Sequence, residues 1–173
     1  MGCFRLDGIG ADLGLRLRAV ACFDCRMADE AHEHTTVAAP PERCYAVAID
    51  FERYPDWARD VKEVTVLDRD ADGRGSRVEY RVAGLGQSIH YILEYDYGDA
   101  PDAFSWQLVE SDKLRQLDGR YGFEPEGAGT RLAYDLTIDV AIPLPGLIKR
   151  QAARMIISTA LRELKKEAER VSG

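Results

Sequence analysis

Tyrosine is the residue type that comes nearest to supplying acid–base chemistry in this chain. A phenol can donate or accept a proton, and a neighbouring arginine can stabilise an enolate oxygen. In a strand, however, a tyrosine ordinarily packs its ring inside and leaves its hydroxyl at the rim. We therefore expect these tyrosines to line a binding site, and we assign no catalytic residue. The candidates are Tyr80, Tyr91, Tyr95, Tyr121 and Tyr134, with Arg120 and Arg131 as possible oxyanion partners.

The sequence contains no nucleophile elbow, no phosphate-binding loop and no acidic metal cluster. His90 shares a predicted strand face with Glu94 and Asp96, so we expect it to point to solvent. We predict no cofactor and no bound metal.

One metal hypothesis competes with that prediction. Cys22 and Cys25 form a C-x-x-C pair, and His32 and His34 follow on what reads as one face of a strand. Together they would make a Cys2His2 zinc set. The spacing between the two halves is shorter than in zinc fingers, and the cysteines lie in a segment without periodicity, so we favour the absence of zinc.

The composition is that of a soluble globular protein. Its 173 residues suffice for one domain with a core of its own, and 46% of them are hydrophobic and 31% charged. The net charge of −7 and the pI near 5.0 argue against the basic surface that a nucleic-acid-binding protein needs. No apolar run approaches the roughly 18 residues that span a bilayer.

Residues 1–27 fit poorly with the rest of the chain. Scattered glycines break any periodicity, and arginines interrupt the only candidate for a signal sequence. We expect a disordered extension, or an upstream start that is not used in translation. Three of the four cysteines, Cys3, Cys22 and Cys25, lie here rather than among the strands, so we expect a reducing cytoplasm; Cys44 is expected in the core.

Residues 28–173 read as one domain of antiparallel strands and helices. Residues 30–39 favour a first strand, and a short helix opens at 40–42 with proline near its start. An aromatic turn follows at 51–57, broken by Pro55. Period-two alternation with one polar face then predicts an antiparallel sheet, and Gly119 is interpreted as a bulge or kink. The further strands are predicted at residues 62–69, 76–83, 88–97, 103–110, 114–123 and 130–140.

One long helix, at residues 147–171, completes the pattern, and we expect the sheet to curl around it. Ile148, Met155 and Ile156 lie off its buried stripe, so a ligand, a partner or the aromatic turn must cover them. We expect the ligand pocket or its gate at residues 147–157, opposite Trp57. The predicted stripe is Ala153, Ile157, Ala160, Leu161, Leu164, Ala168 and Val171.

The helix is also basic, although the whole chain is acidic. Such a helix could make weak contact with an anionic membrane surface. The favoured alternative is a solvated face whose lysines and arginines pair with Glu163, Glu167 and Glu169.

Four segments in this order resemble the START-like (SRPBCC) superfamily and, within it, the polyketide cyclase/dehydrase and coenzyme Q-binding group. The resemblance spans about residues 29–170. The segments are Phe51-x-x-Tyr54-Pro55-x-Trp57, Leu117-Asp118-Gly119-Arg120-Tyr121-x-Phe123-x-Pro125, Gly129-Thr130-Arg131-Leu132-x-Tyr134 and Pro143-Leu144-Pro145-Gly146.

The resemblance implies an α+β helix-grip fold, in which a seven-stranded antiparallel sheet wraps the C-terminal helix around an apolar cavity. It also implies a ligand such as a lipid, a quinone, a sterol or an aromatic polyketide, and a minority of members are enzymes. We therefore expect a carrier or sensor of a hydrophobic small molecule. An aromatic polyketide cyclase/dehydratase and a protein-interaction module are the alternatives.

The expected partner is that small molecule, and we expect a monomer or a homodimer that binds no nucleic acid. The predicted ligand-binding residues are Trp57, Tyr80, Tyr91, Tyr95, Trp106, Tyr121, Tyr134, Met155 and Ile156.

Overall fold

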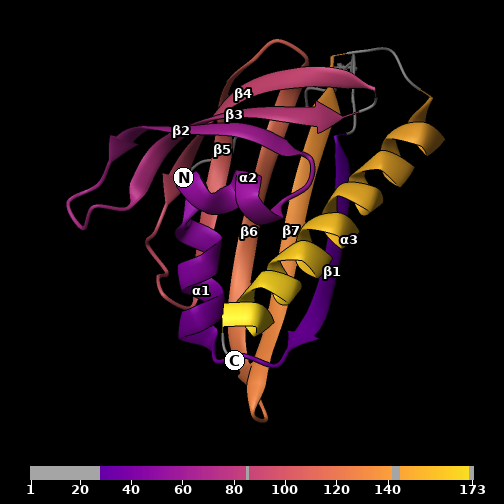
Figure 1. The fold of residues 1–173 in the computed structure, drawn as a ribbon. Coiled ribbons are helices and arrows are strands. Elements are labelled where there is room, and N and C mark those ends of the chain that lie inside the picture. The colour runs from indigo at the N-terminus through magenta and orange to yellow at the C-terminus, as the bar shows by residue number, and fades with distance from the viewer. Residues whose placement is uncertain (1–27, 85, 142–144, 172–173) are drawn as a thin grey trace, which may run out of the picture.

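The computed structural model describes residues 28–84, 86–141 and 145–171 (Figure 1). The extension at residues 1–27, with three cysteines and the cysteine half of the zinc hypothesis, lies outside the described residues, as do residues 143 and 144 of the Pro-Leu-Pro-Gly segment. The elements are β1 (Asp29–Val37), α1 (Pro41–Ile49), η1 (Phe51–Arg53), α2 (Tyr54–Trp57), β2 (Val61–Arg69), β3 (Gly75–Gly84), β4 (Gln87–Asp96), β5 (Ala103–Ser111), β6 (Leu114–Glu126), β7 (Gly129–Val140) and α3 (Gly146–Val171).

The seven strands form one antiparallel sheet in the order β1-β7-β6-β5-β4-β3-β2. Sequential strands are therefore neighbours, except that β1 pairs with β7, the last strand, and not with β2. The sheet curves around α3, with the short helices after the first strand beside it, as predicted (Figure 1).

Strand alternation places the core on the concave face of the sheet. Phe104 and Trp106 of β5 lie on this face, as do Leu132, Tyr134 and Leu136 of β7, and all five are buried. Burial of such large apolar side chains is the main favourable contribution to folding.

Gly119 was interpreted as a bulge or a kink, and the structure has no bulge at this residue. The register shift between β6 and β7 lies between Leu114 and Gln116. Gly119 instead lies under the indole of Trp106, where a Cβ atom would collide with the ring. The glycine is needed here because the large ring lies flat against the backbone of β6.

The stripe predicted for α3 is confirmed over most of its length. Ala153, Ile157, Leu161, Leu164 and Ala168 are buried against β1, β7 and α1. Val171, which was predicted to belong to the stripe, is exposed. In Figure 1 the yellow end of α3 passes close to α1, whereas its orange beginning extends past the strands.

The helices α1, η1 and α2 close one end of the concave face. Pro41 occupies the first turn of α1, where its missing N–H costs nothing. The Tyr54 hydroxyl donates a hydrogen bond of 2.6 Å to the Ala48 carbonyl and so ties α2 back to α1. None of the helices among the described residues is long and apolar enough to cross a bilayer.

Candidate functional site

A continuous layer of aromatic rings covers the concave face of the sheet. Tyr80 of β3 stacks on Tyr91 of β4 with ring centroids 5.2 Å apart. Trp106 of β5 lies 5.4 Å from Tyr121 and 5.5 Å from Tyr134, measured between centroids. These distances are typical of favourable aromatic pairs.

Six of the nine predicted binding residues therefore meet in one cluster, because period-two alternation brings side chains of adjacent strands to the same face. We call this set the aromatic cluster. Its members are Tyr80, Tyr91, Tyr95, Trp106, Tyr121 and Tyr134.

The hydroxyls of the aromatic cluster divide into two groups. The Tyr80 and Tyr95 hydroxyls form a hydrogen bond of 2.7 Å with each other. Those of Tyr91, Tyr121 and Tyr134 make no hydrogen bond to any of the residues that the structure describes. Since a buried hydroxyl ordinarily has a partner, these three are available to a bound molecule.

Burial determines the protonation state of these tyrosines. It raises the pKa of Tyr91 above the ordinary value of 10.0, because an apolar surrounding disfavours the phenolate. It raises the pKa of Tyr80, Tyr121 and Tyr134 further, with a contribution from neighbouring tyrosines. The cluster is therefore neutral at physiological pH, and its hydroxyls act as hydrogen-bond donors or acceptors rather than as bases.

Charged groups are separate from the cluster. Among the described residues the buried carboxylates are Asp139, paired with Lys149 at 3.2 Å, and Glu167, paired with Arg170 at 2.6 Å. Arg120 pairs with Asp99 at 2.7 Å and is half-exposed.

Both proposed oxyanion partners, Arg120 and Arg131, lie on the face of the sheet opposite to the aromatic cluster. Arg120 precedes Tyr121, and Arg131 precedes the buried Leu132, so each falls on the outer face of the sheet. His90 also lies on that face, where it contacts Glu79 at 2.7 Å. Neither of these arginines nor His90 therefore reaches the rings of the aromatic cluster.

Phe51, Tyr54 and Phe104 extend the layer but were not among the predicted site residues. Phe51 lies 4.5 Å from Tyr95, and Phe104 lies 5.6 Å from Tyr121, between ring centroids. Phe104 could have been identified, since it alternates with Trp106. Phe51 and Tyr54 belong to the aromatic turn, and only the tertiary path of η1 brings that turn against β4.

Three predicted residues lie outside the cluster. Trp57 contacts only the margin of the layer, at 4.7 Å from Tyr54, and shares a groove with Glu167 and Val171 near the end of α3. Met155 and Ile156 are exposed by 62% and 40%. The expectation that Trp57 lies opposite residues 147–157 is therefore wrong: α2 packs toward the other half of α3, where Arg59 bonds Glu163.

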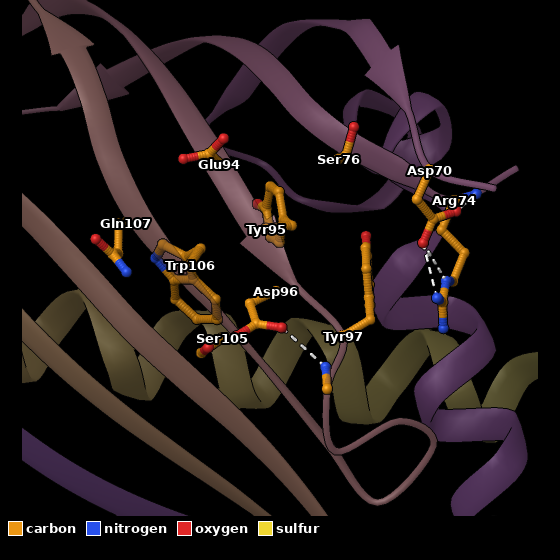
Figure 2. A pocket seen from close by; sticks show the side chains of 11 residues that line it. Asp70, Arg74, Ser76, Glu94, Tyr95, Asp96, Tyr97, Ser105, Trp106 and Gln107 are labelled. Carbon is orange, nitrogen blue, oxygen red and sulfur yellow. Dashed lines mark hydrogen bonds and ion pairs between the residues drawn. The ribbon is translucent and has the colours of Figure 1, made fainter. Parts of the chain in front are cut away.

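A polar hollow of about 500 Å³ lies where the β2–β3 turn meets β4 and β5, and Tyr95 and Trp106 of the aromatic cluster also line it (Figure 2). Arg74 bonds Asp70 there at 2.7 Å and lies over the ring of Tyr97 at 4.4 Å. Glu94 and Gln107 line it from positions that alternate with the aromatic cluster. The sequence analysis did not identify this hollow, because its residues come from four separate segments.

Both the sequence and the fold of this chain are similar to those of known proteins. Residues 29–169 match the sequence model of the family described as polyketide cyclase/dehydrase and lipid transport. The search of curated proteins found no match.

Solved structures share the fold over most of the chain. A START superfamily protein from Mycobacterium smegmatis is 28% identical, with a TM-score of 0.78, over 82% of this chain and 98% of that one. A protein from Thermus thermophilus is 25% identical, with a TM-score of 0.71, over 83% and 99%. The Zhui aromatase/cyclase from Streptomyces sp. R1128, at 19% identity and a TM-score of 0.70 over 83% and 95%, shows likeness of fold alone.

Proposed function

This chain belongs to the polyketide cyclase/dehydrase and lipid transport family, and we propose that within it the chain is a carrier or sensor of a hydrophobic small molecule. The binding domain is residues 28–173, and the ligand occupies the space between the concave face of the sheet and α3. The ligand class is a lipid, a quinone or an aromatic polyketide.

The observation that carries the proposal is the aromatic cluster itself. Ligand sites are mostly apolar, with a few polar groups that fix orientation. Here the rings supply the apolar surface, and the unbonded hydroxyls of Tyr91, Tyr121 and Tyr134 supply the polar groups. Neutral hydroxyls suit carbonyl or hydroxyl oxygens, so among the three ligand classes we favour an aromatic molecule that carries oxygen.

A cyclase/dehydratase acting on an aromatic polyketide is the second candidate. The hydroxyl pair of Tyr80 and Tyr95 favours it, because two bonded phenols could polarise a substrate carbonyl. A base that acts near neutral pH needs a pKa near that range, and burial moves the tyrosine pKa values the other way. The carrier is therefore the first proposal.

Purified protein tests the carrier proposal. Organic extraction followed by mass spectrometry identifies a copurified ligand, and titration with menadione, a small quinone, measures affinity through quenching of tryptophan fluorescence. We expect saturable quenching by menadione. Absence of both a copurified apolar molecule and saturable binding of menadione or oleic acid would overturn the proposal.

Single hydroxyl deletions test the site. Tyr134→Phe keeps the ring and removes one unbonded hydroxyl, so we expect menadione affinity to fall about tenfold, the effect of one hydrogen bond. Tyr97→Phe is the matched control, since its hydroxyl already donates to the Gly75 carbonyl at 2.7 Å. We expect that control to lower stability and to leave affinity unchanged.

Turnover distinguishes the two candidates. If the chain cyclises or dehydrates an aromatic polyketide precursor, Tyr80→Phe and Tyr95→Phe should lower kcat more than they raise KM. A carrier gives no product with either the parent chain or the variants.

We also propose a cytoplasmic location and a monomeric or homodimeric state. The concentration of cysteines outside the strands supports the first, and both remain proposals to be tested by fractionation and by size-exclusion chromatography with light scattering.

A further inference from the structure

Four apolar side chains on the first half of α3 remain uncovered. Leu147 is 72% exposed, Ile148 46%, Met155 62% and Ile156 40%. We call these four residues the α3 ridge. Scattered single apolar residues on a surface are ordinary, but a group of large ones at helical spacing marks an interaction site.

The ridge faces away from the protein because of the helical period. At 100° per residue, Ile148 and Met155 lie only about 20° apart, and roughly opposite the stripe that contains Ile157 and Leu164. Leu147 and Ile156 lie about 90° to either side of them. Neither the sheet nor α1 can reach that face without displacing α3. The ridge is therefore a feature of the outer surface and not a poorly packed part of the core.

The charge around the ridge has one sign. From residue 141 to residue 162 the sequence contains no aspartate or glutamate, although the chain as a whole carries a net charge of −7. Arg154 and Arg162 flank the ridge on exposed positions, and neither makes an ion pair with the residues that the structure describes, whereas Arg150 lies about 160° from Ile148. Lys149, by contrast, is held by Asp139.

In the second half of the helix, by contrast, Lys165 and Arg170 form ion pairs with glutamates. Glu167 binds Arg170 and Arg53, and Glu169 lies 3.8 Å from Lys165. Salt bridges of the kind predicted for the whole helix thus occupy its second half. The first half combines exposed apolar side chains with unpaired positive charge.

We propose that the α3 ridge docks on the surface of an anionic lipid bilayer. In that arrangement α3 lies in the plane of the interface, with the ridge among the headgroups and with Arg154 and Arg162 against lipid phosphates. The inference depends on the proposed function in one respect, which is that docking serves to exchange an apolar ligand with the bilayer.

A second copy of the chain suits the ridge less well. A two-fold contact through this face would bring Arg154 and Arg162 close to the basic residues of the other copy, and like charges in an interface are unfavourable. Four side chains also form a much smaller patch than the roughly 800 Å² per partner of a stable interface. A lipid surface supplies negative charge and needs no shape complementarity.

Flotation of the full chain with vesicles tests the proposal. We expect binding to vesicles of phosphatidylcholine with phosphatidylglycerol, weak binding to phosphatidylcholine alone, and loss of binding at high salt. The double variant Arg154→Gln/Arg162→Gln should lower the partition coefficient roughly 25-fold, about fivefold for each basic residue. Ile148→Glu/Met155→Glu should abolish binding.

Matched controls lie elsewhere on the surface. Arg150→Gln removes an exposed charge from the opposite side of the same helix, and Val109→Glu changes an exposed apolar residue of β5. We expect both controls to bind as the parent chain does. All variants retain residues 1–27, so binding through that extension would survive the ridge substitutions.

Three results would overturn the inference. The first is failure of the parent chain to bind anionic vesicles, and the second is binding that the ridge variants leave unchanged. The third is a dimer in light scattering that the ridge variants convert to monomer, which would identify a second copy as the occupant. Menadione affinity, measured without vesicles, should be the same in all variants, so failure of docking and failure of ligand binding are distinguishable.

Discussion

At the scale of the residue, the contact between Gly119 and Trp106 is what allows the largest ring to lie in the aromatic cluster. A Cβ atom at position 119 would overlap the indole and would also lie 2.8 Å from the Asp135 carbonyl oxygen. The carbonyl belongs to the backbone of β7 and cannot rotate away. A side chain at this position therefore has to displace either a strand or the indole.

We predict that Gly119→Ala destabilises the protein by about 1–3 kcal/mol, the usual cost of overpacking a core. Urea denaturation monitored by circular dichroism measures the change in the free energy of unfolding, and the fluorescence of Trp106 should shift with it. Gly122→Ala on the same strand is the control, since its Cβ atom would lie 3.7 Å from that of Ala133. Equal stability of the two variants would contradict the argument.

The sequence was sufficient to predict which tyrosines face inward, and it was insufficient to locate Gly119. Alternation along one strand reports the face of each residue, so Tyr91 and Tyr95 could be assigned without knowledge of any neighbour. The role of Gly119 depends on the indole of Trp106 in the adjacent strand. The register between two strands cannot be determined from the sequence of either strand alone. A glycine in a strand was therefore read as a bulge.

At the scale of the element, the two halves of α3 differ in their surroundings. Its second half is an ordinary amphipathic helix that packs against β1, β7 and α1. Its first half has apolar side chains on its exposed face and basic side chains next to them. The helical pattern predicted this division correctly. It could not show that Ile148, Met155 and Ile156 stay exposed, because the helical period contains no information about the path of α2.

We predict that truncation of two side chains on this helix has very different effects on the free energy of unfolding. Leu164 is 1% exposed, so Leu164→Ala should cost about 2–5 kcal/mol of stability. Met155→Ala removes an exposed side chain and should change stability by less than about 0.5 kcal/mol. Thermal and urea denaturation give both values; a large loss for Met155→Ala would mean that another part of the chain covers the ridge.

At the scale of the whole molecule, the buried tyrosines make stability sensitive to alkali. Their folded-state pKa values lie above the ordinary 10.0 because burial disfavours the phenolate. Above about pH 10 the unfolded chain therefore releases protons that the folded chain retains, so stability is fully present below pH 10 and falls as the pH rises.

We predict a cooperative alkaline unfolding transition in which tyrosinate absorbance rises together with the loss of circular dichroism. In denaturant the same tyrosines should titrate near the ordinary value of 10.0. Native protein that develops full tyrosinate absorbance while its circular dichroism is unchanged would show that water reaches the cluster freely, and would contradict the burial on which the pKa values depend.

The fold as a whole was the most predictable feature of this chain. Clean alternation in β4 and β7, turns with glycine, and one long helix suffice for an antiparallel sheet on a helix, and the resemblance supplied the strand number. The site was predictable only where it follows from alternation. Trp57, which is placed by a loop path, was assigned to the wrong half of α3.

The pairing of β1 with β7 has a consequence for synthesis on the ribosome. Partners such as Asp29 and Ile138 lie about 100 residues apart, so loop-closure entropy opposes their pairing until most of the chain is available. β1 is translated first and can bury its inner face only after β7 and α3 have emerged. Folding should therefore complete only once β7 and α3 have been synthesised, and β1 is the strand that a chaperone would hold in the meantime.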